Sequence, residues 1–249
     1  MYLCNQIFIF NLSLVIISCV ITGFSAGACN FNVQVEQFLR NEGFHRNITY
    51  TITFENPDDE ERMHKDCVLS LYQILPSGAF ANPDELKDFR RLHKLNAIPK
   101  NRINVELPAE QSEPSGVYIV SKVTEDTVEV WLPVHARYHM AVRGGGTFRN
   151  EIKGPQLYLR CPDKRLDTCN IKTAPAMKFL CKGDSKEKCN WKEIPFTMMT
   201  ETLVWHMPVG NTDHYYVVAL GTIIVGVVGS LYLLKTIHEY KVAAKRRRL

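Results

Sequence analysis

The sequence has almost no net charge once its basic C-terminal end is set aside. The 249 residues include 30 Lys and Arg against 26 Asp and Glu, but residues 235–249 hold six of the basic residues and one acidic residue. The rest of the chain therefore carries 24 basic and 25 acidic residues. Because nucleic-acid binding requires a basic field that faces the phosphates, this near-neutral part gives no support for that function.

The compositional biases of non-globular chains are also missing. The chain has 14 Gly and 12 Pro, with 45% hydrophobic and 22% charged residues, and it contains no internal repeat or heptad pattern. These values exclude collagen-like, low-complexity and wholly disordered chains. We therefore expect a folded body of one or two domains.

The sequence also lacks the common catalytic motifs. It has no G-x-S-x-G elbow, and residues 144–146 lack the Lys and the adjoining helix of a phosphate-binding loop. His135 and His139 would face one metal on a helix, but we expect a strand that places the cation Arg137 between them. The sequence thus predicts no catalytic residue, no metal and no cofactor, and it favours a binding or assembly role.

Two long apolar runs are present, and the first predicts a signal peptide. Residues 7–24 are apolar apart from isolated Asn, Ser and Thr, and a small-residue cleavage site follows at residues 26–28. We therefore expect residues 1–28 to be removed during export. An uncleaved anchor is the alternative, because the run is long enough to cross a membrane.

The second apolar run, residues 215–234, predicts a transmembrane helix. It contains no charge, and at about 1.5 Å per residue it spans the roughly 30 Å hydrocarbon core. The positive-inside rule places residues 235–249 in the cytosol as a basic tail and residues 29–213 in the lumen. Small residues of this kind are common in membrane helices, but here three of them share one face that a partner helix could approach: Thr222, Gly226 and Ser230.

The cysteines predict disulfide bonds in an oxidising compartment. Six remain after the predicted signal peptide, and four of these lie within residues 161–189, where we expect a small cross-linked lobe. Zinc is the alternative, but the close C-x2-C pairs of structural zinc sites are absent. The spacing does not select one pairing. The disulfide candidates are Cys29, Cys67, Cys161, Cys169, Cys181 and Cys189.

One glycosylation motif agrees with a lumenal body. Asn47-Ile48-Thr49 is the only N-x-[ST] acceptor after residue 28, because Asn56 and Asn82 are followed by proline and lack the motif. We therefore expect an N-linked glycan on Asn47.

The hydrophobic periodicity predicts a mainly β fold. Alternating or β-branched runs at residues 48–54, 117–123 and 128–134 predict strands. One helix is predicted, with Asn82 as its N-cap and an end near residue 94 or 95. Turns are expected at 76–78, 114–116 and 144–146, and a loop or irregular edge at 99–114. Short strands without alternating helices favour a lumenal antiparallel β-sandwich-like domain.

Three segments resemble one known family. Residues 74–86 read ILPSGAFANPDEL, residues 132–139 read LPVHARYH, and the third segment runs from Cys189-Asn190-Trp191 through Met207-Pro208-Val209-Gly210 into the terminal apolar run. In this order they resemble the phosphatidylinositol-glycan biosynthesis class X proteins, the small subunit of mannosyltransferase I of the endoplasmic reticulum.

The resemblance implies a non-catalytic partner of a multispanning mannosyltransferase. That enzyme transfers the first mannose from dolichol-phosphate mannose to the glycosylphosphatidylinositol (GPI) precursor. A partner that binds only the folded enzyme would stabilise it against unfolding and degradation. We expect contacts at His135, Arg137, Tyr138 and His139, at Pro208, Val209 and Gly210, and at the small-residue helix face. The alternatives are a type I cell-surface receptor or adhesion protein, and a hydrolase of the secretory pathway.

Overall fold

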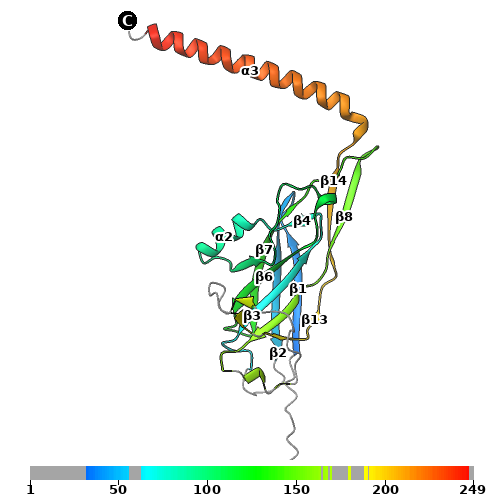
Figure 1. The fold of residues 1–249 in the computed structure, drawn as a ribbon, viewed down its shortest axis with the longest axis vertical. Coiled ribbons are helices and arrows are strands. Elements are labelled where there is room, and N and C mark those ends of the chain that lie inside the picture. Colours follow the sequence, from blue (N-terminus) through cyan, green and yellow to red (C-terminus); the bar gives the residue numbers. More distant parts are fainter. Residues whose placement is uncertain are drawn as a thin grey trace, which may run out of the picture.

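A computed structural model describes residues 32–55, 63–163, 165–167, 169, 179–180, 188–189 and 191–246. The predicted signal peptide, Cys29, Cys181 and most of the predicted cysteine-rich lobe lie outside these residues. Figure 1 shows an elongated β body and one long helix, α3 (Tyr215–Arg246), which projects from the end of the body where β8 and β14 lie.

Most of the strands form two five-stranded sheets. The first sheet has the order β13 (Thr197–Met198), β1 (Asn32–Arg40), β2 (His45–Glu55), β7 (Thr127–Ala136), β4 (Ala79–Phe80). The second has the order β12 (Lys192–Glu193), β9 (Gln156–Arg160), β3 (Val68–Leu75), β6 (Ser115–Lys122), β5 (Ala97–Pro99). Every neighbouring pair is antiparallel except β1 and β13.

The smaller elements complete the described structure. Two-stranded sheets join β8 (Gly146–Ile152) to β14 (Leu203–Val209) and β10 (Phe179–Leu180) to β11 (Lys188–Cys189). The short helices are α2 (Pro83–Arg91), η1 (Ala109–Gln111), η2 (Arg165–Asp167) and η3 (Thr212–His214).

The two large sheets enclose one hydrophobic core. Alternate side chains of β2, from Ile48 to Phe54, are buried in the same cluster as Leu69 and Leu71 of β3 and Ile119 of β6. A buried polar pair links the two sheets within this core: the Tyr50 hydroxyl donates to Gln73 Oε1 at 2.8 Å. The mainly β, sandwich-like fold is thus confirmed.

The predicted helix is confirmed at its start and ends earlier than predicted. Asn82 Oδ1 accepts a hydrogen bond from the Asp84 N–H at 3.0 Å, and Pro83 is the first helical residue. The helix ends at Arg91 rather than near residue 94, because His93 has a left-handed backbone with φ of 54°.

The predicted turn at residues 114–116 is wrong for its last two residues, since β6 begins at Ser115. Gly116 has a packing role instead of a turn role. A Cβ atom there would lie 2.4 Å or less from the ring and hydroxyl of Tyr72 on the neighbouring strand. Only glycine leaves room for that aromatic side chain.

A disulfide joins Cys67 to Cys161. These residues adjoin the paired ends of β3 and β9, where Val68 lies opposite Arg160, so the bond continues the pairing of the two strands. Cys169 is disulfide-bonded as well. The prediction of disulfides is therefore confirmed for these three cysteines.

Helix α3 starts at Tyr215, and its apolar part is fully exposed. Residues 212–243 are long and apolar enough to cross a membrane, and none of the most apolar window is buried in the structure. The helix continues without a break into the predicted basic tail as far as Arg246. A single C-terminal membrane-spanning helix fits these features.

Candidate partner-binding surface

The four predicted contact residues at the end of β7 and just after it do not share one exposed face. Strand β7 ends at Ala136, so the next three residues leave the sheet. Tyr138 is 77% exposed, whereas Arg137 is 5% exposed and the His139 side chain 4%. The expectation that one strand carries His135, Arg137 and His139 is therefore corrected: the strand ends at Ala136, Tyr138 faces solvent, and its two neighbours are packed inside the body.

Arg137 holds a loop in place. Its Nη1 donates to the Leu107 carbonyl at 2.7 Å and to the Val105 carbonyl at 3.4 Å, and its guanidinium carbon lies 4.5 Å from the centre of the Phe80 ring. Burial lowers the pKa of Arg137 from its ordinary value. The side chain thus fastens the loop around residue 107 to the end of β7.

His139 is fixed by contacts on several sides. Its ring stacks on Phe148 with centroids 4.1 Å apart, its Nε2 lies 3.1 Å from Asn150 Nδ2, and its Nδ1 lies 3.4 Å from Glu110 Oε1. The same carboxylate oxygen accepts from the Met140 N–H at 2.9 Å, and this bond lowers the pKa of Glu110. These contacts hold the backbone on both sides of Tyr138 and Met140 in one position.

His135 belongs to a cluster that the sequence did not reveal. Its Nε2 lies 2.8 Å from Glu85 Oε2, and His45 Nε2 lies 3.3 Å from the other oxygen of the same carboxylate. Two imidazoles and one carboxylate within 4.8 Å could ligate Zn²⁺. The two rings stack at 4.2 Å with an interplanar angle of 14°, and both Nε2 atoms lie against the one Glu85 carboxylate. We interpret the cluster as a hydrogen-bonded clasp between α2, β2 and β7.

Five exposed apolar side chains lie around this fixed segment, and we call them the collar: Phe44, Tyr138, Met140, Val142 and Phe148. Two of them touch across the loop before β2, with the rings of Phe44 and Tyr138 5.7 Å apart. A set of apolar side chains held outward by a rigid backbone is typical of a protein or membrane contact.

The collar is bonded directly to the start of the membrane helix. The Val142 N–H donates to the Gly210 carbonyl at 2.9 Å, and the Thr212 N–H donates back to the Val142 carbonyl at 3.0 Å. The Gly144 N–H lies 3.0 Å from both Asn211 Oδ1 and Asp213 Oδ2. The collar and the segment that leads into α3 through η3 therefore form one structural unit.

The predicted contact at Pro208, Val209 and Gly210 lies in this unit. Pro208 is exposed and Val209 is half-buried at the end of β14. A Cβ atom at Gly210 would lie 3.2 Å from the Ala141 Cβ, so glycine permits the close approach of the two segments. Their position beside the membrane helix fits the expected contact.

The small-residue face of α3 is exposed along its length. Thr222 Oγ1 donates to the Val218 carbonyl at 2.8 Å, and Ser230 Oγ donates to the Gly226 carbonyl at 2.7 Å. Both hydroxyls are thus satisfied within the helix. This face offers close packing to another helix rather than hydrogen bonds.

A model of one protein family, described as PIG-X / PBN1, matches residues 41–238. The chain belongs to the PIG-X / PBN1 family. The match extends from the loop before β2 through the second sheet, all of the first sheet except β1, and most of α3. PIG-X / PBN1 membership therefore applies to the body and to the membrane helix together.

Three mammalian relatives are similar over most of their length. The mouse protein is 27% identical over 227 residues, which cover 87% of each chain. The rat protein is 27% identical over 217 residues, covering 85% of this chain and 84% of the relative. The human protein is 24% identical over 212 residues, covering 84% and 81%. Each is named GPI alpha-1,4-mannosyltransferase I, stabilizing subunit.

Proposed function

We propose that this chain is the non-catalytic stabilising subunit of GPI mannosyltransferase I in the membrane of the endoplasmic reticulum. Its partner would be the multispanning catalytic subunit that transfers the first mannose from dolichol-phosphate mannose to the GPI precursor. The observation that carries this proposal is the family match over both the sandwich and α3, with mammalian relatives named as stabilising subunits.

The body would lie in the lumen of the endoplasmic reticulum. The Cys67–Cys161 disulfide supports an oxidising compartment, and the Asn47 motif supports exposure to the glycosylation machinery. The basic residues after the apolar run support a cytosolic C-terminus. In this orientation the collar lies at the lumenal end of the membrane helix.

We further propose that the collar and the small-residue face of α3 bind the catalytic subunit. The side chains of Tyr138 and Met140 would provide apolar contacts beside the bilayer, while Arg137 and His139 fix the backbone from inside. A ligand that binds only the folded state stabilises it by about 2.7 kcal/mol at 100 times its dissociation constant. A subunit present in excess would thus protect its enzyme without supplying a reactive group.

The test is capture of the catalytic subunit from detergent-solubilised membranes by tagged variants of the full chain. We expect the double variant Tyr138→Ser, Met140→Ser to recover at least tenfold less catalytic subunit and to lower its steady-state level. The matched control is Leu92→Ser, which removes an exposed leucine just after α2. Recovery of no mannosyltransferase by the wild-type chain would overturn the proposed function itself.

The receptor or adhesion alternative makes a different prediction. It requires the chain at the cell surface, where surface biotinylation would label it, and it requires no effect on GPI-anchored proteins. We expect the chain to be protected from surface labelling, and its loss to deplete GPI-anchored proteins from the cell surface.

A further inference from the structure

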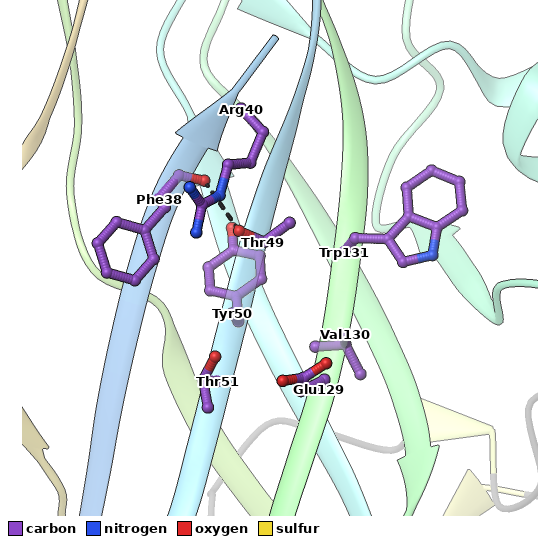
Figure 2. Close-up of a pocket in the computed structure, with 8 residues that line it drawn as sticks. All are labelled: Phe38, Arg40, Thr49, Tyr50, Thr51, Glu129, Val130 and Trp131. Atoms are coloured by element: carbon purple, nitrogen blue, oxygen red, sulfur yellow. Dashed lines mark hydrogen bonds between the residues drawn. The ribbon is translucent and has the colours of Figure 1, made fainter.

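The outer face of the first sheet is hollowed next to the predicted glycosylation site. The hollow has a volume of about 330 Å³ and opens on the side of the sheet that faces away from the core. Figure 2 shows its threonines on β2, between Phe38 on β1 and Glu129 and Trp131 on β7. The residues that line it are Phe38, Arg40, Thr49, Tyr50, Thr51, Glu129, Val130 and Trp131.

The strand register puts Asn47 in the row of residues beside this hollow. Thr49 lies opposite Phe38 on one side and Trp131 on the other. Asn47, two residues earlier on β2, lies opposite Arg40 in the same way. Because alternate residues of a strand share one face, Asn47 and Thr49 point to the same side, about 7 Å apart along the strand.

The lining has the chemistry of a sugar-binding surface. Phe38 is an aromatic wall, and the threonine methyl groups beside it add to an apolar floor on which the C–H faces of a sugar ring can pack. Trp131 borders the hollow from β7, and its ring packs edge-on against Phe89 of α2. Arg40 lies over the Phe38 ring with its guanidinium carbon 4.8 Å from the ring centre, and Glu129 is exposed at the rim. Both side chains can hydrogen-bond to sugar hydroxyl and acetamide groups.

We propose that the first sugars of the N-linked glycan on Asn47 pack into this hollow. One N-acetylglucosamine unit is long enough to pass from the row of Asn47 to the row of Thr49. The occupant is thus part of the mature chain itself, and the acceptor motif supplies one residue of the lining, Thr49. This inference rests on the proposed lumenal position of the body.

The glycan would then cover an apolar part of the sheet and restrict where the partner binds. Phe38 is 37% exposed in the absence of any covering group. A branched glycan over β1, β2 and β7 excludes a large protein from that face. The catalytic subunit would therefore bind at the collar, at the end of the body from which α3 projects, and at α3 itself.

The test compares release of the glycan by peptide-N-glycosidase F from the folded and the denatured full chain in detergent. The enzyme must reach the bond between Asn47 and the first sugar. We expect release from the folded protein to be at least tenfold slower than after denaturation, and Phe38→Ser to accelerate the folded-state release at least fivefold. The control Ile74→Ser, an exposed residue on the second sheet, should leave the rate unchanged.

A double-mutant cycle provides a second measurement that does not depend on enzyme access. Asn47→Gln should lower the thermal midpoint of the wild type, and at least half of that loss should disappear in the Phe38→Ser background. An equal loss in both backgrounds, or equal release rates, would overturn the packing of the glycan while leaving the proposed function intact. A chain without any glycan on Asn47 would overturn the inference.

Discussion

The replacement Arg137→Ala tests whether this residue supports the fold or contacts the partner. The residue stands in the segment that resembles the family, so either role would explain an inactive variant. The structure makes it a support, because the guanidinium is buried and bonded to two carbonyls of its own chain. If Arg137 supports the fold, its replacement destabilises the isolated chain. If it only contacts the partner, its replacement weakens the complex and leaves the stability of the isolated chain unchanged.

The expected cost is about 3 kcal/mol. A hydrogen bond from a charged donor contributes about 1.5–3 kcal/mol, and here the 2.7 Å bond to the Leu107 carbonyl is the strong one. The contact with the Phe80 ring adds about 1 kcal/mol. Burial of the charge opposes these gains, as the lowered pKa of Arg137 indicates, and among the described residues no carboxylate forms an ion pair with it.

Urea unfolding of the full chain in detergent, followed by tryptophan fluorescence, measures this cost without the partner. With a denaturant slope of about 2 kcal/mol/M, a loss of about 3 kcal/mol lowers the midpoint by about 1.5 M. The matched control is Arg143→Ala in the same segment, whose side chain is 91% exposed and 3.7 Å from Asp213. That variant should lose less than about 0.5 kcal/mol. Equal midpoints for the two variants would refute the supporting role of Arg137.

Three further predictions concern stability. Replacing both Cys67 and Cys161 with Ala should lower the free energy of unfolding by about 4–5 kcal/mol, because the bond closes a loop across a sequence separation of 94. Thermal unfolding measures this loss, and the wild type under reducing conditions should show a loss of the same size. Asn82→Ala should lower the free energy of unfolding by about 1 kcal/mol, because the helix loses its cap. Asn82→Asp should keep most of the stability that the cap provides, as measured in the same assay. Glu110→Gln should cost about 0.5 kcal/mol near pH 7, a value reduced by solvent screening. The hydrogen bond from the Met140 N–H lowers the pKa of Glu110 below its ordinary 4.5. The stability difference between the wild type and Glu110→Gln should therefore be present above pH 4.5 and vanish as the pH falls through the lowered pKa. A constant difference down to pH 3 would contradict this prediction.

Local patterns in the sequence were sufficient for strands β2, β6 and β7 and for the helix start. The alternation from Ile48 to Phe54 reflects one buried and one exposed face, and the Asn82-Pro83 pair satisfies free N–H groups and sets φ at the helix start. Gly116 was misjudged because a turn and a close approach by Tyr72 both select glycine. Only the neighbouring strand distinguishes these two reasons.

The candidate site depended on contacts that are distant in sequence. Arg137 and His139 were expected as contact residues because they are polar and were assigned to the same strand as His135. The loop around Leu107 and Glu110 buries them, and no periodicity indicates that this loop folds against residues 30 positions later. The clasp of His45, Glu85 and His135 was missed for the same reason, since its members lie on three separate elements.

The position of the collar follows from how the chain joins its body to the membrane. The backbone around Val142 is bonded to Gly210 and Thr212, immediately before α3 begins. Any force that the bilayer or a partner helix exerts on the start of α3 is therefore transmitted to the collar through hydrogen bonds rather than through a flexible linker. A partner that packs against the small-residue face of α3 would meet Tyr138 and Met140 at a fixed height above the lipid. Because the two contact areas cannot move independently, the second contact forms with little additional loss of entropy, and binding at both sites is stronger than binding at either alone.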